Sequence, residues 1–194
     1  MNYLAHLFLA QPCPDSYYGN LLGDFRKGVE LNTLPQGVLN GLKTHYLVDD
    51  FTDKHALVKQ GKNLFSAKRR RFAGVALDVL FDYFLIKHWH QFSDAEFIDF
   101  KLNSYQLLAK RRPVMPTTMQ RVTGKIIQQD WFGSYADIAG VSHALDNIAR
   151  RIRFKNEFNH SIDDINQHYV EFENLFLAFF PQLMSHIKQH NPEV

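Results

Sequence analysis

The sequence has very little cysteine: Cys13 is the only one, and it lies between Pro12 and Pro14. A single cysteine excludes a disulfide within the chain, and its scarcity fits the reducing cytosol. Because prolines flank it and no helix start is evident there, we interpret Cys13 as a turn residue rather than a nucleophile.

Long apolar runs are also lacking. No stretch approaches the roughly 20 apolar residues that are needed to cross a bilayer. The apolar segment at residues 1–10 is short, contains a histidine and lacks the positive leader of a signal peptide. We therefore expect a cytoplasmic protein without a membrane partner.

Several catalytic motifs are missing. The sequence contains no Gly-x-Ser-x-Gly elbow, no Gly-x-x-x-x-Gly-Lys-Ser/Thr phosphate loop, no Gly-x-Gly-x-x-Gly fingerprint and no His-Glu-x-x-His pair. These absences argue against serine hydrolases of the elbow type, P-loop and dinucleotide-binding proteins, and the simplest zinc proteases. Metal-assisted attack by water remains, and we expect its target to be a phosphoryl group.

Apolar and aromatic residues are abundant. The 194 residues are 45% hydrophobic and include 17 phenylalanines, which is enough for one domain with a bulky core. Alternating strand patterns are rare, whereas apolar residues recur at helical spacing. We therefore predict a single all-α domain, a helical bundle that covers residues 1–194. The expected helices cover residues 2–10, 16–25, 35–53, 57–72, 74–90, 93–110, 117–131, 138–154 and 162–190.

One histidine and several aspartates stand out within these helical patterns. His45, Asp49 and Asp53 are each four residues apart, and Asp78 and Asp82 repeat that spacing in a very apolar segment. Residues four apart share one helix face. Carboxylates that face one way inside a protein repel each other unless a cation compensates them, and a divalent metal would do so.

Two further residues could join this group. Asp24 follows the apolar run Asn-Leu-Leu-Gly, and His6 lies in the first apolar segment. Oxygen and imidazole ligands suit Mg²⁺, Mn²⁺ or Fe²⁺, whereas thiolates would indicate zinc. Simpler roles also fit the pattern: Asp53 as a helix cap, Asp49 as a solvated side chain, and each histidine as a hydrogen-bonded core residue.

Basic residues gather at positions 68–71, 110–112 and 150–153, although the formal net charge is only +2. That charge is too small to indicate nucleic acid. The aromatic residues are spaced like core residues and do not indicate a stacking platform for RNA. A charge run is usually a solvated helix face, but such a face can also dock an acidic protein.

Some arginines could reach the acidic group. Arg150 and Arg151 follow an apolar helical pattern, so at least one of them could turn inward and bind a phosphate in a bidentate way. Arg26 and Lys27 come directly after the Asp24 segment and could flank the same pocket.

The chain resembles the acyl carrier protein phosphodiesterases over nearly its whole length. The segments that carry the resemblance are Met1-Asn2-Tyr3-Leu4-Ala5-His6-Leu7, Gly19-Asn20-Leu21-Leu22-Gly23-Asp24-Phe25, His45 to Asp53, Leu77-Asp78-Val79-Leu80-Phe81-Asp82-Tyr83-Phe84-Leu85, His88-Trp89, Asp130-Trp131 and Ala149-Arg150-Arg151. They follow the order in which that family has them.

The resemblance implies an activity in fatty-acid and lipid metabolism. Family members cleave the phosphodiester between a carrier-protein serine and 4′-phosphopantetheine, which gives apo carrier protein and free 4′-phosphopantetheine. They are cytoplasmic, use a divalent metal, typically Mn²⁺, and are linked to the HD superfamily of helical metal phosphohydrolases. The HD pattern includes an adjacent His-Asp pair that this sequence lacks, since Tyr46 follows His45.

The residue pattern and the resemblance together predict the site. We expect four residues to hold the metal: His6, Asp24, His45 and Asp78. Asp49 and Asp82 would be catalytic, either as further ligands or as acceptors that orient the attacking water. Arg26, Arg150 and Arg151 would bind the substrate, and a basic surface would dock the acidic holo-acyl carrier protein.

Two alternative functions fit the sequence less fully. One is a metal-dependent nucleotide phosphohydrolase of the same broad superfamily. The other is a non-catalytic helical module that binds an acidic protein through its basic faces.

Overall fold

The computed structural model describes residues 1–154 and 156–193, and within them it contains eleven α-helices and no strand. The prediction of an all-α domain is therefore confirmed. The helices are α1 (Tyr3–Leu9), α2 (Pro14–Leu22), α3 (Gln36–Lys54), α4 (Ala56–Leu64), α5 (Ala73–Lys87), α6 (Phe97–Arg111), α7 (Thr117–Gln128), α8 (Trp131–Ser134), α9 (Ile138–Arg151), α10 (Ser161–Gln167) and α11 (Tyr169–His190). None of them is long and apolar enough to span a membrane.

Two long helices that the sequence predicts are interrupted. The helix expected at residues 57–72 ends at Leu64, because Phe65 adopts an extended backbone, and a separate 3₁₀ turn follows at Arg70–Phe72. The helix expected at residues 162–190 is divided into α10 and α11, because the backbone of His168 leaves the helical conformation.

Two predicted helix starts also differ. The N-cap residue of α6 is Glu96 rather than Ser93, because the Ser93 hydroxyl instead accepts a hydrogen bond from the Ala95 amide and forms a local turn. Cys13 is the N-cap residue of α2 and is exposed, so it does lie at a helix start.

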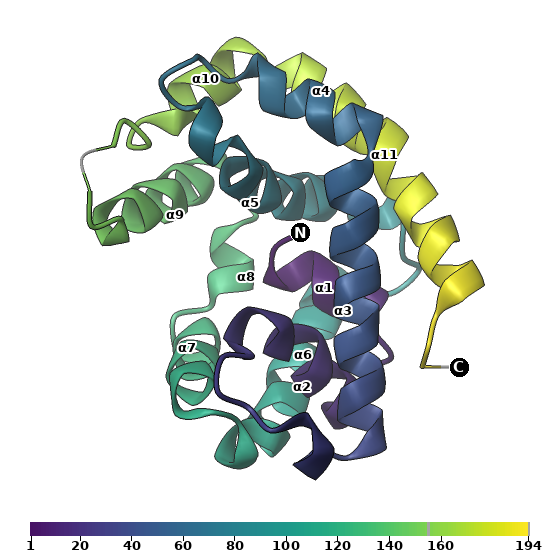
Figure 1. Cartoon of the computed structure of the whole chain (residues 1–194). Helices are drawn as coiled ribbons and strands as arrows, with labels where there is room; N and C mark the ends of the chain where they lie inside the picture. The colour runs from purple at the N-terminus through teal and green to yellow at the C-terminus, as the bar shows by residue number, and fades with distance from the viewer. Residues whose placement is uncertain (155, 194) are drawn as a thin grey trace.

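The helices are arranged around α5, which crosses the middle of the molecule (Figure 1). α3 and α11 run beside each other along one side, and α4 lies along α11. α5 contacts α1, α4, α9 and α11, while α2 packs against α3 and α6. The N-terminus lies where α1, α3 and α5 meet, because the amino group of Met1 contacts Asp49 of α3 and Asp78 of α5.

α2 and α3 approach each other closely because glycines occupy their contact. A Cβ on Gly19 would lie 2.1 Å from the carbonyl oxygen of Val38, and one on Gly41 would lie 2.5 Å from the carbonyl oxygen of Ser16. No side chain fits at such distances. This contact holds α3, which carries His45, tightly against the N-terminal part of the chain.

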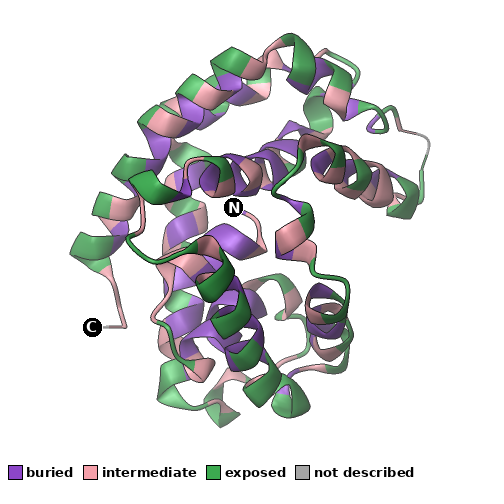
Figure 2. Ribbon diagram, turned by 180° about the vertical axis from the view of Figure 1, so that it is seen from behind, coloured by how far each residue is buried: buried purple, intermediate pink, exposed green. Residues whose placement is uncertain are grey.

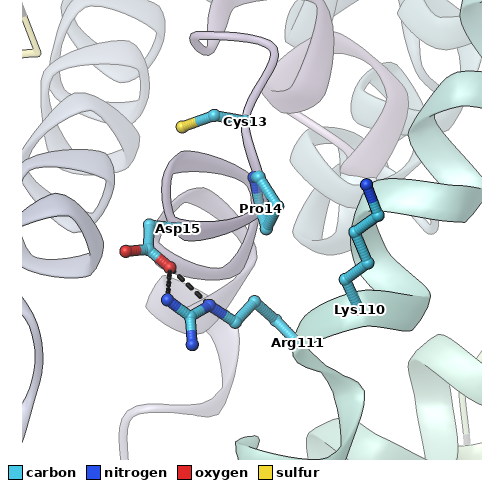
Figure 3. A pocket seen from close by; sticks show the side chains of 5 residues that line it. All are labelled: Cys13, Pro14, Asp15, Lys110 and Arg111. Carbon is cyan, nitrogen blue, oxygen red and sulfur yellow. Dashed lines mark hydrogen bonds and ion pairs between the residues drawn. The ribbon is translucent and has the colours of Figure 1, made fainter.

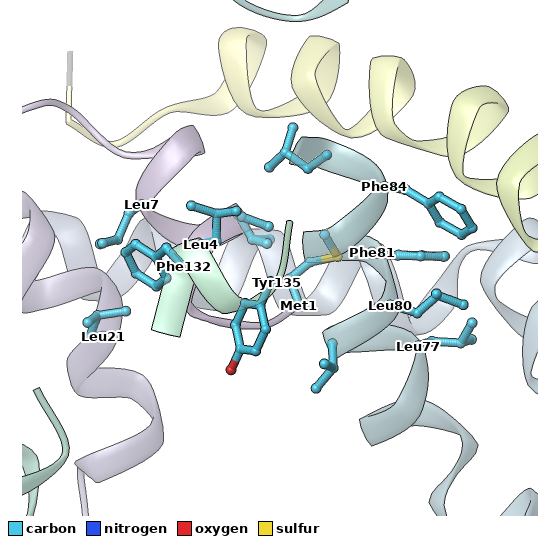
Figure 4. Close-up of a cluster of buried hydrophobic side chains, with 14 of the residues drawn as sticks. Met1, Leu4, Leu7, Leu21, Leu77, Leu80, Phe81, Phe84, Phe132 and Tyr135 are labelled. Carbon is cyan, nitrogen blue, oxygen red and sulfur yellow. The ribbon is translucent and has the colours of Figure 1, made fainter. Parts of the chain in front are cut away.

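The core consists mainly of aliphatic and aromatic side chains around α5. Buried residues line the inward faces of the helices in Figure 2, while the outer faces are exposed. Figure 4 shows Phe81 and Leu80 of α5 in one cluster with Leu4 of α1 and Phe132 of α8. α5 therefore carries its two aspartates on an apolar, densely packed helix.

Asp82 of α5 stabilises the start of α1. Asn2, the N-cap residue of α1, provides no side-chain cap. Instead the Leu4 amide donates to Asp82 Oδ2 at 3.1 Å and the Ala5 amide donates to Oδ1 at 3.0 Å. Burial raises the pKa of Asp82 to about 7, although both amides act in the opposite direction. A residue distant in sequence thus supplies the cap that orients the helix carrying His6.

We predict that Asp82→Ala lowers the free energy of unfolding by about 1–3 kcal/mol, because two buried amides lose their acceptor. Urea denaturation followed by circular dichroism measures this loss. Asp82→Asn should lose less, since its amide oxygen still accepts one bond. An alanine variant as stable as the parent protein would show that the cap contributes nothing.

Candidate metal centre

Asp49 lies between two buried histidines from different helices. Its Oδ1 is 3.2 Å from His6 Nε2 of α1, and its Oδ2 is 3.0 Å from His45 Nε2 of α3. The two imidazoles stack on each other with ring centres 4.2 Å apart. The four-residue spacing of His45 and Asp49 therefore does place them on one face, as the sequence predicts. His6, which stacks on His45, lies 39 positions earlier in the sequence and on a different helix.

These three side chains could hold a metal ion. One ligand atom from each of His6, His45 and Asp49 lies within 4.8 Å of the others. The Nδ1 atoms of His6 and His45 are buried without a hydrogen-bond partner, and Nε2 of His6 has only its contact with Asp49. Buried polar atoms are rarely left unsatisfied, and at least one His6 nitrogen would gain a partner from a bound cation. The donor set of this group therefore fits a divalent metal.

The amino group of Met1 shows that this region favours a cation. Its nitrogen lies 3.2 Å from Oδ1 of Asp49 and 3.2 Å from Oδ1 of Asp78. Burial alone would lower the pKa of this amine, but Asp78 and Asp49 outweigh burial and raise it to about 10. A positive charge bridging these two carboxylates is thus stabilised.

The protonation states suit metal ligation. Burial lowers the pKa of His6 to about 4, so its imidazole is neutral at pH 7 and retains a lone pair. Burial acts to raise the pKa of Asp49, but the contacts with His45 and His6 and the Met1 ammonium outweigh it and hold the pKa below its usual range. Imidazole and carboxylate ligands of this kind suit first-row divalent ions.

A small cavity of about 130 Å³ adjoins the group. It is lined by Met1, Asp24, Asp49, Thr52, Asp53, Val58, Lys62, Gly74 and Asp78. Burial raises the pKa values of Asp24 and Asp78, and in each case the charge of Asp49 adds to the effect. The structure therefore brings two of the predicted metal ligands to the edge of the His6–His45–Asp49 group.

Asp82 occupies a different position. Its oxygens accept hydrogen bonds from backbone amides of α1, as described above, and its side chain is fully buried. It does not line the acidic cavity. These contacts favour a positioning role for Asp82 rather than the catalytic one that the sequence predicts.

The three candidate arginines differ in their surroundings. Arg26 is exposed and donates to the hydroxyl of Tyr46 at 3.3 Å. Arg150 is exposed and bonds within its own helix, to the Asp146 carbonyl at 3.3 Å and to Asn147 Oδ1 at 2.7 Å. Arg151, the next residue, is also exposed and has neither of these contacts.

The evidence for Arg151 comes from two tyrosines that the sequence analysis did not single out. Burial raises the pKa of Tyr3, Asp24 and Tyr135 raise it further, and Arg151 opposes them. Burial also raises the pKa of Tyr135, and Arg151 again acts in the opposite direction. Figure 4 shows Tyr135 beside Met1 with its hydroxyl pointing away from the apolar cluster. The charge of Arg151 therefore acts on both phenols, and that of Asp24 acts on Tyr3.

A second, more open cavity of about 380 Å³ lies elsewhere (Figure 3). It is lined by Cys13, Pro14, Asp15, Lys110 and Arg111. Arg111 pairs with Asp15 there, and none of its lining residues belongs to the acidic group. Its lining offers only Cys13 and Asp15 as candidate metal ligands.

Comparison with known proteins agrees with this geometry. The family profile described as "Acyl carrier protein phosphodiesterase" matches residues 1–183. Curated relatives with that name include the Yersinia pestis protein, 35% identical over 185 residues that cover 95% of this chain and 96% of the relative. The Photorhabdus laumondii protein is 35% identical over 188 residues (95% and 93%), and the Serratia proteamaculans protein is 32% identical over 189 residues (97% and 98%). No solved structure gives a significant match.

We predict that Gly23→Ala weakens metal binding. A Cβ on Gly23 would lie 2.0 Å from Cδ2 of His45, so the imidazole has to move out of its position beside Asp49. We expect the Mn²⁺ dissociation constant to rise by about 10-fold or more, as measured by equilibrium dialysis and metal analysis.

Gly124→Ala provides the matched control, because its Cβ would lie 3.4 Å from Nη1 of Arg112, an ordinary contact. That variant should bind Mn²⁺ like the parent protein. Equal Mn²⁺ affinity of Gly23→Ala and Gly124→Ala would mean that His45 is not a ligand.

Proposed function

Because the chain belongs to the acyl carrier protein phosphodiesterase family, we propose that its acidic centre hydrolyses the phosphodiester that joins 4′-phosphopantetheine to the serine of holo-acyl carrier protein. The products are the apo carrier protein and 4′-phosphopantetheine. The observation that carries this proposal is the group of His6, His45 and Asp49, in which buried imidazole nitrogens lack partners beside a carboxylate.

We further propose that the enzyme depends on a divalent metal, with Mn²⁺ preferred. His6, His45 and Asp49 would hold it, and Asp24 and Asp78 would complete the acidic surroundings. When bound, the metal would polarise a water molecule and a phosphoryl oxygen. The placement of the Met1 ammonium between Asp49 and Asp78 supports a cation in this position.

The side chains have distinct tasks in this mechanism. Asp49 stays ionised, because its pKa is held low, and it would supply the carboxylate ligand beside the two imidazoles. Asp24 lines the cavity beside Asp49 and would face the incoming substrate. Arg151 binds the phosphate oxygens from the side of Tyr3, while Asp82 keeps α1 and its histidine in position.

The carrier protein docks on basic residues near the site in this proposal. Arg69 is buried and pairs with Asp164 at 3.0 Å, so it is not available for docking. Its neighbours Lys68, Arg70 and Arg71 are exposed and precede α5, which carries Asp78. An acidic protein surface is complementary to such a patch.

The proposal also covers the location of the enzyme, its domain organisation and the type of metal centre. We propose a cytoplasmic enzyme that forms one domain over residues 1–194, with the metal centre arranged as in the helical HD phosphohydrolases. The shared apolar core around α5 and the position of the ligands on two helices, α1 and α3, support a single unit.

The direct test is incubation of purified protein with holo-acyl carrier protein and Mn²⁺, followed by mass spectrometry of the intact carrier protein. We expect a mass loss equal to the prosthetic group, and no loss after metal is removed with a chelator. Nucleotides and cyclic nucleotides are assayed in parallel. Unchanged holo protein at every metal and pH tested would refute the proposed reaction.

We predict that Arg151→Gln lowers kcat/KM for holo-acyl carrier protein by about 10-fold to 100-fold, because a charge-assisted contact to phosphate is lost. Arg150→Gln is the matched control and should stay within about 3-fold of the parent protein, since Arg150 bonds only within α9. Steady-state kinetics separates them. Similar losses in both variants would indicate general charge attraction rather than a phosphate contact.

A further inference from the structure

The acidic cavity contains one positively charged side chain among the residues that the structure describes. Lys62 of α4 lines it together with the carboxylates of Asp24, Asp49, Asp53 and Asp78. A phosphodiester is an anion, and four carboxylates repel it unless cations compensate them. Lys62 is therefore placed where a substrate phosphate needs a partner.

Lys62 has a loosely held partner of its own. Its Nζ lies 3.1 Å from Oδ1 of Asp53, and the Asp53 side chain is 75% exposed, whereas that of Lys62 is only 31% exposed. An ion pair with such an exposed carboxylate contributes little to stability. Water can easily replace the Lys62 ammonium at Asp53. The ammonium can therefore leave the Asp53 carboxylate and bind a phosphate oxygen instead.

The surroundings leave room for such an exchange. A Cβ on Gly74 would lie 3.4 Å from Cε of Lys62 and 3.7 Å from its Nζ, so the ammonium lies above the first turn of α5 with no side chain below it. The charge of Lys62 also acts to lower the pKa of Asp78, one turn further along α5. Lys62 is thus close to both the start of α5 and a cavity carboxylate.

We propose that Lys62 binds a non-bridging oxygen of the substrate phosphodiester and that Asp53 holds the ammonium in place until the substrate enters. This proposal rests on the proposed function. Lys62 approaches from α4, while Arg151 lies on the side of Tyr3, so the two cations reach the phosphate from different helices.

The proposal predicts different effects at the two ends of the ion pair. Lys62→Gln removes the phosphate contact and should lower kcat/KM for holo-acyl carrier protein by about 10-fold to 100-fold. Asp53→Asn releases the ammonium from its partner but leaves the ammonium in the cavity, so kcat/KM should fall less than it does in Lys62→Gln. If the pair were only structural, the two variants would lose activity equally.

Binding provides a second readout. The affinity of the metal-free protein for holo-acyl and apo-acyl carrier protein is measured by isothermal titration calorimetry. The parent protein should prefer the holo form, because only that form carries the phosphate. Lys62→Gln should reduce this preference without weakening apo binding, and Lys62→Arg should restore part of it because it retains the charge.

Lys54→Gln is the control for lost surface charge. Lys54 pairs with Asp50 at 2.6 Å on the exposed face of α3, outside the cavity lining. This variant should match the parent protein in both assays, and thermal unfolding checks that every variant is folded.

The outcomes separate the two proposals. If the parent protein releases no 4′-phosphopantetheine, the proposed function fails, and the holo-versus-apo affinities alone decide the role of Lys62. If the parent protein is active and Lys62→Gln behaves like Lys54→Gln, or loses no more than Asp53→Asn, the phosphate contact of Lys62 is refuted while the proposed function stands.

Discussion

The rest of the site depends on the contacts of Asp49. This one carboxylate lies beside His6 of α1, His45 of α3 and the amino group of Met1, so it joins segments that are distant in sequence. Burial penalises its charge, and the cationic and polar neighbours repay that penalty. His6 is neutral at pH 7, and the Nδ1 atoms of His6 and His45 lack hydrogen-bond partners, so the group holds more ligand atoms than protein partners can use.

The two aspartates of α5 show how one spacing serves two purposes. Asp78 faces the cavity and the Met1 amine, whereas Asp82 is fully enclosed and accepts the amides of α1. Burial raises the pKa values of both. A cation compensates Asp78, and the N-terminus of α1 compensates Asp82. Neither carboxylate is therefore left without a partner on the apolar helix.

The sequence is informative about features that depend on local periodicity. Helical spacing predicted the all-α class and the shared face of His45 and Asp49, because both follow from neighbours on one helix. It did not predict that Asp82 caps α1 or that Lys62 faces Asp53, since these contacts join different helices. The end of α4 at the extended, buried Phe65 was also missed, because the local sequence carries no clear helix-terminating signal there.

Arg150 and Arg151 show the same limit at the level of one helix. The motif treats the two arginines alike, but adjacent residues on an α-helix point about 100° apart. Arg150 therefore bonds to Asp146 and Asn147 of its own helix, while Arg151 influences Tyr3. The two side chains therefore leave α9 in different directions, which the motif alone does not reveal.

The partial exposure of the acidic centre suits a scissile phosphodiester that lies on the surface of another protein. The imidazoles of His6 and His45 are buried, whereas the side chains of Asp49 and Asp78 are 37% and 36% exposed. The cavity of about 130 Å³ is smaller than the roughly 300–1,000 Å³ of typical small-molecule pockets. It accommodates a phosphate but not a whole 4′-phosphopantetheine arm. Because the scissile phosphate is attached directly to a serine of the folded carrier, a shallow centre lets that serine approach without unfolding. In the function that we propose, recognition comes largely from the protein surface around the serine, and the exposed basic residues before α5 are the docking surface proposed for it.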